Sequence, residues 1–435
     1  RKRRIFCGKV KSSINQIYAG GTFQSIGGQP RNNIAAIDIT TGQLTSWDPN
    51  ANNQIASLVI SGNTVYAGGY FTTIGGQSRN YLAAIDASGN ATAWNPNANN
   101  AVKTITISGN TVYTGGFFIT IGGQARKFIA AIDGVTGNAT SWNPGANAGV
   151  LTLIISGDTL YAGGIFDSIG GQKRNYIAAL NTSSSTATLW DPDADYEVYA
   201  LAVSGSIVYA GGGFTNIGGQ VRSYIAAIST SGFGNATGWN PTADASVFTI
   251  AVSGNTIYAG GTFTNIGALS RNYLAALDNL GFATSWDPNM SAVVRTIGAF
   301  GNTVFAGGDF TGVGGNNSYQ YLVEFPACSG MAVSISYSDV KCNGGNDGSA
   351  TANPSGSAIP YNYFWNNGIT DQTSTGLSSG NYQVTVTSSG GCTSSSVVSI
   401  SQPALLIIST IVANATCGSP TGSVTANSSG GTTPY

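Results

Sequence analysis

Residues 55–96 read IASLVISGNTVYAGGYFTTIGGQSRNYLAAIDASGNATAWNP, and this stretch decides the fold because close copies of it fill residues 1–327. Its Tyr-Ala-Gly-Gly string, or a near variant, returns at intervals of 47 to 49 residues. A fixed period of about 20 to 50 residues is the sequence signature of a repeat architecture. The first glycines of the seven pairs are Gly20, Gly68, Gly115, Gly163, Gly211, Gly260 and Gly307.

Each copy contains four short segments that are typical of β-strands. In the quoted copy they are residues 55–60, 64–68, 81–86 and 91–94. Ser61-Gly62-Asn63 suits a tight hairpin, because Gly and Asn tolerate a positive φ, and Pro96 cannot donate to a strand ladder. Neither face of these strands is strongly polar, so each sheet must be covered by its neighbours. We therefore expect an all-β chain whose residues 1–327 form a seven-bladed β-propeller.

The expected packing combines small and large side chains. Ala83 and Ala84 of the third strand let adjacent sheets approach, whereas a tryptophan at the end of the fourth strand supplies apolar area near the outer edge. The seventh copy lacks its Trp-Asn-Pro segment, so either residues before Arg1 supply it or that blade has three strands. The six repeated tryptophans are Trp47, Trp94, Trp142, Trp190, Trp239 and Trp286.

Composition excludes several classes of function. The 435 residues include no histidine, which rules out Ser-His-Asp hydrolysis and histidine-liganded metals. With 18 acidic and 17 basic residues the net charge is −1, so nothing attracts the chain electrostatically to nucleic acid or to anionic membranes. No apolar run of about 18 residues is present, and we expect no direct membrane insertion.

A second type of repeat begins near Met331, where the glycine pairs stop. The string CNGGNDGSATA from Cys342 returns as CGSPTGSVTA from Cys417, 75 residues later. Alternating apolar and polar residues predict an immunoglobulin-like β-sandwich over residues 331–403, with Trp365 in its core. Residues 404–435 then form a second sandwich repeat that is cut short, so we expect the natural polypeptide to continue beyond Tyr435.

The cysteines suggest two disulfides. Cys342 and Cys392 fall at the two ends of one predicted sandwich and could pair. Cys7 and Cys328 lie in the first and last repeats of the predicted ring, where a disulfide would latch it closed, and Cys417 is left over. Paired cysteines would place the protein in an oxidising compartment, outside the cell or in the periplasm.

The second region resembles the SprB-type repeat of surface adhesins from gliding bacteria. The residues that carry the resemblance are CNGGNDGSAT, IPYNYFWNNG, GLSSGNYQVTVT and GGCT. The resemblance implies export by the type nine secretion route and a location on the cell surface or in the medium. The first region resembles kelch-like and delta-sixty propeller repeats through IYAGG, FTxIGGQxRN and the strand-four tryptophan. Such repeats vary widely in activity, so they imply the fold more than the function.

Glutamine and arginine recur in the connection between the second and third strands, which should emerge on the same face as the linkers between blades. A ring of amide and guanidinium groups would suit sugar hydroxyls or carboxylates. The alternative is that each arginine ties its own loop to carbonyls or to an aspartate such as Asp48, Asp191 or Asp287, because residues that repeat usually serve the scaffold. The candidate binding residues are Gln77, Arg79, Gln124, Arg126, Gln172, Arg174, Gln220 and Arg222.

One linker is unusually acidic. It carries Asp191, Asp193, Asp195 and Glu197, where the equivalent linkers read NPNANN or NPGANA. Oxygens at alternate positions can surround a hard cation, so these residues form a candidate calcium site. Pro192 and the lack of a glycine depart from the EF-hand loop, and a simply solvated acidic loop is the alternative. Calcium is the only cofactor that the sequence suggests.

These features together predict a secreted or cell-surface protein without enzymatic activity. It would act as an adhesin, binding protein or extracellular structural protein, with the propeller as an interaction module on a stalk of sandwich repeats. An extracellular glycan or a surface protein would be its partner. Two alternatives stay open. The chain could self-associate as the subunit of an extracellular filament, or it could be a polysaccharide-active enzyme that uses carboxylates, although no unrepeated pair of acids is visible.

Overall fold

The computed structural model describes residues 4–11, 16–300, 303–317, 320–326, 331–355, 361–388 and 392–434. These residues form strands, turns and loops, and no helix occurs among them. The chain divides into two compact units, Arg1–Phe325 and Pro326–Tyr435. The chain is therefore all-β, as the sequence predicts, and no helix that could span a membrane is found in its described part.

Unit one consists of antiparallel three-stranded sheets that repeat along the chain, and we number them one to seven in chain order. The first strands are β1 (Arg4–Lys11), β6 (Ile55–Ser61), β11 (Val102–Ser108), β16 (Val150–Ser156), β21 (Val198–Ser204), β26 (Val247–Ser253) and β31 (Val294–Phe300). The middle strands are β2 (Gln16–Thr22), β7 (Thr64–Gly69), β12 (Thr111–Gly116), β17 (Thr159–Gly164), β22 (Ile207–Gly212), β27 (Thr256–Gly261) and β32 (Thr303–Gly308). The third strands are β5 (Ile34–Asp38), β10 (Leu82–Ile85), β15 (Ile129–Asp133), β20 (Ile177–Asn181), β25 (Ile225–Ser229), β30 (Leu274–Leu277) and β33 (Leu322–Pro326).

A small hairpin joins the middle strand to the third strand in sheets one to six. In sheets one to five its tip is a pair of glycines with positive φ, such as Gly75 and Gly76 at +58° and +74°, a conformation that side chains rarely adopt. In sheet six the second glycine is replaced by Ala268, which keeps the positive φ at +66°. The hairpins are β3 (Ser25–Ile26) with β4 (Gln29–Pro30), β8 (Thr73–Ile74) with β9 (Gln77–Ser78), β13 (Thr120–Ile121) with β14 (Gln124–Ala125), β18 (Ser168–Ile169) with β19 (Gln172–Lys173), β23 (Asn216–Ile217) with β24 (Gln220–Val221), and β28 (Asn265–Ile266) with β29 (Leu269–Ser270).

The predicted fourth strand is reduced to a single bridge. In sheet two, Ile85 of β10 pairs with Ala91 alone, and the equivalent bridges occur in sheets one and three to six. The chain leaves the sheet because the main-chain N–H of Trp94 bonds to the side-chain oxygen of Thr92, which bends the segment just before the tryptophan. We call each such segment, from its bridge residue to the proline after its tryptophan, the fourth segment. No such bridge to β33 is found among the described residues of sheet seven.

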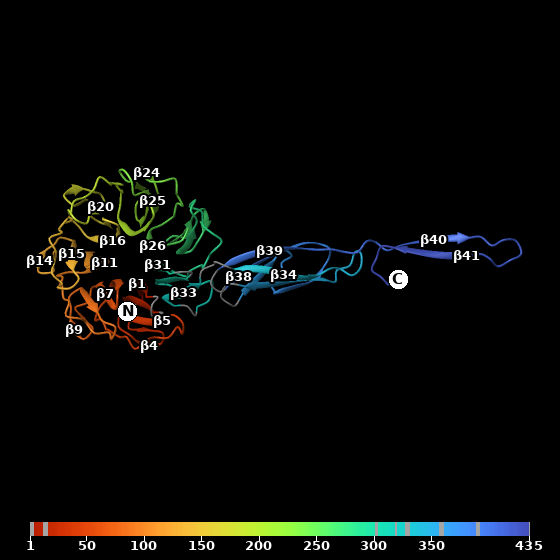
Figure 1. Cartoon of the computed structure of the whole chain (residues 1–435), viewed down its shortest axis with the longest axis horizontal. Coiled ribbons are helices and arrows are strands. Elements are labelled where there is room, and N and C mark those ends of the chain that lie inside the picture. The colour runs from red at the N-terminus through yellow and green to blue at the C-terminus, as the bar shows by residue number, and fades with distance from the viewer. Residues whose placement is uncertain are drawn as a thin grey trace. The chain divides into compact units, whose positions relative to one another are not determined.

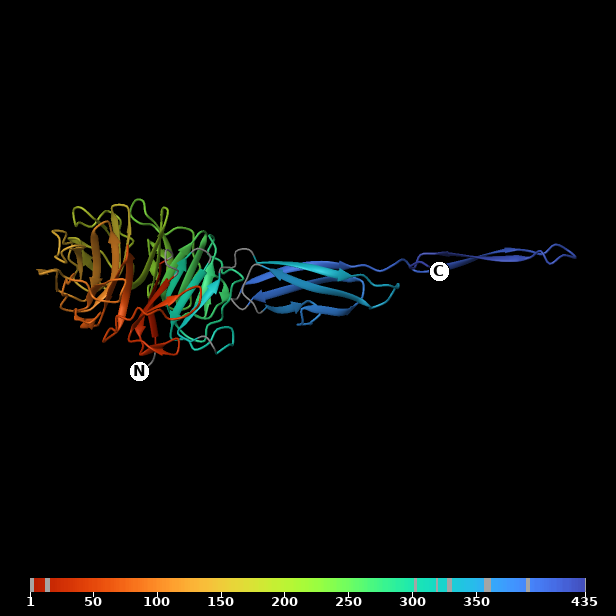
Figure 2. The same cartoon turned by 60° about the horizontal axis from the view of Figure 1, so that its bottom comes forward.

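The sheets follow one another in a closed ring. The first strands lie side by side, and β1 contacts both β6 and β31. In Figure 1 the labels of β11, β16, β26 and β31 lie toward the middle of the ring, whereas the hairpin strands β9, β14 and β24 lie at its outside. The turned view in Figure 2 shows the same sheets of unit one standing next to one another. The first strands therefore lie toward the middle of the ring, and the hairpins lie toward its outside.

Glycine allows adjacent sheets to approach. A Cβ atom on Gly163 would lie 2.7 Å from Cγ1 of Val198 in the next sheet, and one on Gly307 would lie 2.7 Å from Cγ2 of Ile5. The second contact joins sheet seven to sheet one. Ala83 and Ala84 are fully or almost fully buried, as expected. The packing role of the first glycine in each pair was not predicted from the sequence.

Tryptophan fills the space between neighbouring sheets. Trp47 packs edge-to-face on Tyr18 of its own sheet, with ring centroids 4.9 Å apart, and belongs to one apolar cluster with Phe71 and Ile74 of the next sheet. Its indole N–H donates a hydrogen bond of 2.9 Å to the carbonyl of Asp86, 39 residues further on. The same bond joins Trp94 to Asp133, Trp142 to Asn181, Trp190 to Ser229 and Trp239 to Asp278.

Unit two contains two three-stranded sheets that share a core. One has the order β34 (Ala332–Ser338), β35 (Gly348–Ser355), β37 (Thr373–Leu377), and the other β36 (Tyr361–Trp365), β38 (Gly380–Ser388), β39 (Thr393–Ile400). Trp365 is fully buried among Ala350, Val384 and Val386, which confirms its predicted place in a core. The strands β40 (Ile407–Ala413) and β41 (Ser423–Ser429) pair with each other and are exposed throughout.

The predicted disulfide between Cys342 and Cys392 is wrong. Cys342 is a free, exposed thiol in a turn, whereas Cys392 is buried just before β39. Cys417 is also free and exposed. The predicted pair of Cys7 and Cys328 lies outside the described residues, which include neither Cys328 nor the side chain of Cys7.

Candidate binding sites

The repeated arginines fasten each hairpin to the fourth segment of its own sheet. In sheet two, Nη1 of Arg79 donates to the carbonyl of Ser78 at 2.8 Å, and Nη2 donates to that of Thr92 at 2.6 Å. Arginine suits this task because its fork of fixed donors can reach two acceptors at once. The same pair of bonds is made by Arg31, Arg126, Arg174, Arg222 and Arg271.

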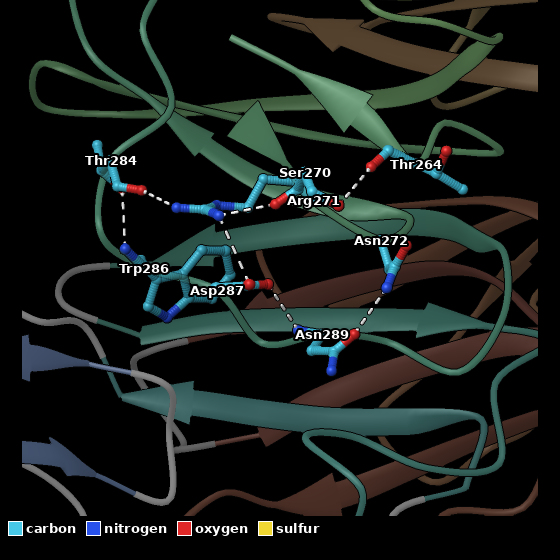
Figure 3. A network of polar contacts seen from close by, with 8 residues as sticks. All are labelled: Thr264, Ser270, Arg271, Asn272, Thr284, Trp286, Asp287 and Asn289. Carbon is cyan, nitrogen blue, oxygen red and sulfur yellow. Dashed lines mark hydrogen bonds and ion pairs between the residues drawn. The ribbon is translucent and has the colours of Figure 1, made fainter. Parts of the chain in front are cut away.

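Figure 3 shows this arrangement in sheet six. Arg271 lies between the carbonyls of Ser270 and Thr284, and its Nη1 is 3.5 Å from Oδ2 of Asp287. The corresponding distances are 3.8 Å from Arg31 to Asp48 and 3.3 Å from Arg174 to Asp191. Only 11% of the Arg271 side chain is exposed. The contacts are those of the scaffold alternative, so a ligand-binding role for Arg79, Arg126, Arg174 and Arg222 stays a prediction that the geometry does not favour.

The glutamines of the same motif are placed differently. Gln77, Gln124, Gln172 and Gln220 begin the second strand of their hairpins, and all four are exposed. Within the described residues their side-chain amides make no hydrogen bond to protein. Their donors and acceptors therefore remain open to a polar ligand at the outside of the ring.

The four acidic residues of the linker do not gather around a common point. Asp191 faces Arg174, Asp193 accepts a bond of 2.7 Å from Asn175, and Asp195 accepts from the next hairpin. No group of three acidic or cysteine side chains that could hold a metal ion occurs in the part of the chain that the structure describes. The expected calcium site at Asp191, Asp193, Asp195 and Glu197 thus finds no ligand set, because each of these carboxylates is used by a different neighbour.

Asp195 instead fixes its linker to the next sheet. Its Oδ1 accepts from the main-chain N–H groups of Thr215 and Asn216 at 2.7 and 3.0 Å, and its Oδ2 accepts from both side chains. Burial raises the pKa of Asp195, but these hydrogen bonds outweigh burial and lower it to about 2. Hydrogen bonds from Thr264 and Asn265 likewise outweigh burial at Asp244 and lower its pKa to about 2. The equivalent neutral residues are Asn52, Asn99 and Asn147.

The start of each first strand has a feature that the sequence pattern does not predict. In each sheet the pairing with the middle strand shifts by one residue there, as between Val198 and Ala200, which leaves Tyr199 in a β-bulge. A bulge re-aims one side chain and is frequent beside functional sites. The signal in the sequence is a position that varies between otherwise similar repeats. The bulged residues are Phe6, Ala56, Lys103, Leu151, Tyr199, Phe248 and Arg295.

Three of these residues come together across sheets five, six and seven. The rings of Tyr199 and Phe248 are 5.5 Å apart in an edge-to-face arrangement, and the Arg295 guanidinium lies 5.8 Å from the centre of the Phe248 ring. Two bonds of 2.8 Å join Arg295 to Asp309. Burial raises the pKa of Tyr199, and a hydrogen bond with Glu197 raises it further, so the phenol stays neutral. We call Glu197, Tyr199, Phe248, Arg295 and Asp309 the bulge cluster.

The chain matches two family models. Residues 334–370 match the SprB repeat, and residues 15–35 and 63–91 match a β-propeller domain of unknown function, DUF5122. These matches confirm the resemblances to propeller repeats and to SprB-type repeats. No curated protein matches the chain.

Several solved structures are similar to the chain. The computationally designed Ika8 protein is 14% identical, with a TM-score of 0.47 over 80% of this chain and 93% of that one. The WD40 domain of Neurospora crassa Pan2 is 10% identical, with a TM-score of 0.48 over 74% and 89%. The extracellular domain of a putative one component system from B. thetaiotaomicron is 13% identical, with a TM-score of 0.44 over 92% and 57%.

Proposed function

We propose that this chain is a secreted or cell-surface binding protein of a gliding bacterium, without enzymatic activity, whose first unit presents a ligand-binding surface. The match of residues 334–370 to the SprB repeat supports the surface location. Export by the type nine secretion route is part of the proposal, since it is what the SprB resemblance implies.

The architecture in this proposal is a seven-bladed propeller over residues 1–327, with an immunoglobulin-like sandwich over residues 331–403 and a partial repeat over residues 404–435. The succession of sheets one to seven and the contact of β1 with β31 support the seven blades. Two sheets around the buried Trp365 support the sandwich. The propeller would act as the interaction module, and the sandwich repeats would form its stalk.

The observation that carries the binding role is the bulge cluster. Residues that repeat around the ring serve every sheet alike, whereas the bulge position differs in each sheet and thus is free to specify a ligand. Tyrosine and arginine contribute strongly to binding surfaces because they combine apolar area with hydrogen-bonding groups. Tyr199 and Phe248 provide apolar area, and the Tyr199 hydroxyl and the Arg295–Asp309 pair provide hydrogen-bonding groups. All four side chains are partly exposed. An extracellular glycan, with its apolar ring faces and many hydroxyls, fits this chemistry.

The absence of catalysis belongs to the proposal as well. The carboxylates of the bulge cluster are both engaged, Glu197 by the Tyr199 hydroxyl and Asp309 by Arg295. Glycoside hydrolysis needs one carboxyl group that gives up a proton and a second that attacks or activates water. Neither carboxylate of the cluster has the open position that such a role requires.

A glycan array with the purified chain tests the proposal. We expect saturable binding to one class of polysaccharide, which Tyr199→Ala reduces by about ten-fold, equivalent to about 1.4 kcal/mol. Leu151→Ala is the matched control, since it changes the bulged residue of sheet four, outside the cluster. Unchanged binding by Tyr199→Ala would place the ligand elsewhere. Release of reducing ends from the bound polysaccharide would support the enzyme alternative instead, and ordered fibres of the purified chain would support the filament.

A further inference from the structure

An amide bridge ties the end of the hairpin to the following linker in sheets one, two, four and six. In sheet two, Nδ2 of Asn80 donates a hydrogen bond of 2.8 Å to Oδ1 of Asn97. Sheet three has Lys127 and Gly145 at these positions and cannot form the bridge, and sheet five has Ser223 in place of the first asparagine. The bridge also joins Asn32 to Asn50, Asn175 to Asp193, and Asn272 to Asn289, the last of which Figure 3 shows.

A groove of about 860 Å³ lies where the bridge of sheet three is missing, between sheets three and four. Ile119 and Phe128 line it from sheet three, and Gln172 lines it from the hairpin of sheet four. The linker contributes Pro144, which is partly exposed here although its equivalents in the other linkers are buried. The groove therefore reaches the linker itself. The equivalent prolines are Pro49, Pro96, Pro192, Pro241 and Pro288.

Two lysines in this groove carry charge that no ion pair offsets. Lys127 and Lys173 both line the groove and are exposed, and neither forms an ion pair with a described acidic residue. Lys173 acts electrostatically on Asp191, but that carboxylate is paired with an arginine. Asp167 is the acid that lines the groove, and it accepts a hydrogen bond from Asn147. Both ammonium groups are therefore open to an anion.

Arg126 adds a positive charge beside the groove. In sheets one, four and six the equivalent arginine faces an aspartate after the tryptophan, whereas sheet three has Asn143 there. Three basic side chains thus lie in or beside the groove, against the one acid that lines it. This is a local excess, because the chain has a net charge of −1 and sheets two to six contain only one further lysine, Lys103. Such an excess raises the local concentration of anions.

The residues that make the groove are departures from the repeat. Ile119 and the two lysines replace uncharged or polar residues of the other sheets, and Gly145 replaces a residue with a side chain in every other linker. Residues that repeat serve every sheet alike. Departures that gather around one groove therefore indicate recognition of a ligand rather than support of the sheet.

The chemistry of the groove fits a negatively charged sugar. Ammonium groups form strong, charge-assisted hydrogen bonds with carboxylates and sulfates. Ile119, which is 51% exposed, and the partly buried Phe128 offer apolar surface to a sugar ring. The side-chain amide of Gln172, which makes no hydrogen bond to the described residues, suits hydroxyl groups. An acidic peptide fits less well, because peptide addition needs a free strand edge and the hairpin strands β14 and β19 have two residues each.

We propose that this groove binds an acidic polysaccharide, with Lys127 and Lys173 holding carboxylate or sulfate groups on its sugar units. Gln172 bonds hydroxyl groups, and the apolar faces of the sugar rings pack on Ile119 and Phe128. The hairpins lie at the outside of the ring, whereas the first strands that carry the bulge cluster lie toward its middle. The groove is therefore a second site, separate from that of the proposed function and selective for negative charge.

A labelled hexamer of galacturonic acid tests this inference on the whole chain. We expect saturable binding by fluorescence anisotropy that weakens from about 0.1 M to about 1 M NaCl, because the screening length falls from about 10 Å to about 3 Å. Lys127→Gln and Lys173→Gln should each weaken binding about three-fold, and together about ten-fold. Lys341→Gln is the matched control, since it removes the same charge from an exposed position in unit two and should bind like the unchanged chain.

A second variant tests the groove without depending on charge alone. Lys127→Asn with Gly145→Asn restores the amide bridge, and the φ of +55° at Gly145 suits asparagine, since Asn97 has a φ of +50°. This variant should lose binding without a lower melting temperature. A sulfated galactan oligomer, measured beside the galacturonate, shows which anionic group the two lysines prefer.

Four results would overturn the inference. The first is no binding of either anionic oligomer up to about 1 mM, the weak end of specific affinity. The second is equal binding of the neutral methyl ester of the galacturonate. The third is an equal loss in Lys341→Gln, which would assign binding to overall charge. The fourth is tighter binding of a polyglutamate peptide through the same lysines, which would assign the groove to an acidic protein. Tyr199→Ala should leave galacturonate binding unchanged, so this inference and the proposed function can fail separately.

Discussion

Single side chains decide how each linker is held to the next sheet. Asp195 and Asp244 do with a carboxylate what Asn52, Asn99 and Asn147 do with an amide, which is to accept the main-chain N–H groups at the start of a hairpin. The carboxylates bind more tightly because a charged acceptor strengthens the hydrogen bond. The linkers of Asp195 and Asp244 are thus held by side chains that titrate, whereas those of Asn52, Asn99 and Asn147 are held by amides that do not.

Acid should therefore weaken the ring at these two junctions. The pKa of each carboxyl group falls from 3.8 to about 2 on folding, so its contribution is complete above pH 4 and is lost as the pH falls toward 2. After allowance for solvent screening, the loss is about 1 kcal/mol per site. The double variant Asp195→Asn, Asp244→Asn replaces both carboxylates with the amide that the other linkers use at this position. Urea denaturation between pH 5 and pH 2 should show a smaller decrease in unfolding free energy for this variant than for the unchanged chain.

Backbone strain gives a second prediction at this scale. Thr242 follows Pro241 in its linker and has a φ of +46°, where the equivalent positions hold Asn50, Asn97 and Gly145. A β-branched residue is unfavourable at positive φ. Thr242→Asn should raise the unfolding free energy by about 0.5–1 kcal/mol, as relief of such strain does. No change in the denaturation midpoint would show that Thr242 is accommodated without strain.

Residue roles were only partly predictable from the sequence. The repeat of Arg79 and its equivalents suggested a scaffold role as one alternative, and their bonds to main-chain carbonyls are of the kind that this alternative expects. The clustering of Asp191, Asp193 and Asp195 was misleading, since nearness in sequence says nothing of direction, and these side chains turn to three different partners. The bulge at Tyr199 could not be predicted, because it depends on the register between two strands.

Among the structural elements, the fourth segment joins two sheets through the indole of its tryptophan. Its N–H is a buried donor to a main-chain carbonyl of the next sheet, and its ring packs edge-to-face on a tyrosine of its own sheet. The sequence predicted the apolar role of these tryptophans from their size. It did not predict the hydrogen bond, because the acceptor is a main-chain atom 39 residues away.

Replacement of one tryptophan tests how much this hydrogen bond between sheets contributes to stability. Trp142→Phe removes the bond of 2.9 Å to the carbonyl of Asn181, which then keeps only the N–H of Ser185 at 3.2 Å. The loss of this hydrogen bond should cost about 1 kcal/mol of unfolding free energy. Tyr113→Phe is the matched control, because it keeps the ring that packs on Trp142 and reproduces Phe305 of sheet seven. The control should change stability by less than about 0.5 kcal/mol. Equal losses for both variants would assign the effect to ring packing alone.

The period of 47 to 49 residues predicted the repeated sheets, but the predicted fourth strand is longer than the single bridge that the structure shows. Ala91, Thr92 and Ala93 alternate as a strand would, yet only Ala91 pairs with its neighbour. The main-chain N–H of Trp94 turns back to the Thr92 hydroxyl, and Arg79 takes the Thr92 carbonyl. Side-chain bonds of this kind compete with a strand ladder and cannot be seen in an apolar pattern.

In the whole ring, sheets approach as closely as glycine allows. Gly163→Ala should destabilise unit one by about 1–3 kcal/mol, because the new methyl group would meet Val198 of the next sheet at 2.7 Å. Gly238→Ala is the control, since it adds a methyl group in open space without a positive φ. Thermal denaturation should show a lower melting temperature for the first variant only, and Val198→Ala should partly restore it. If Gly163→Ala had the same melting temperature as the unchanged chain, the two sheets would be able to move apart to make room for the methyl group.

A closed circle fixes the sum of the angles between its sheets, so no pair of sheets can change its spacing alone. The first glycine of each pair has no side chain that could absorb such a change. Loosening at one place would therefore be passed on around the whole circumference, so the sheets depend on one another even where they do not touch.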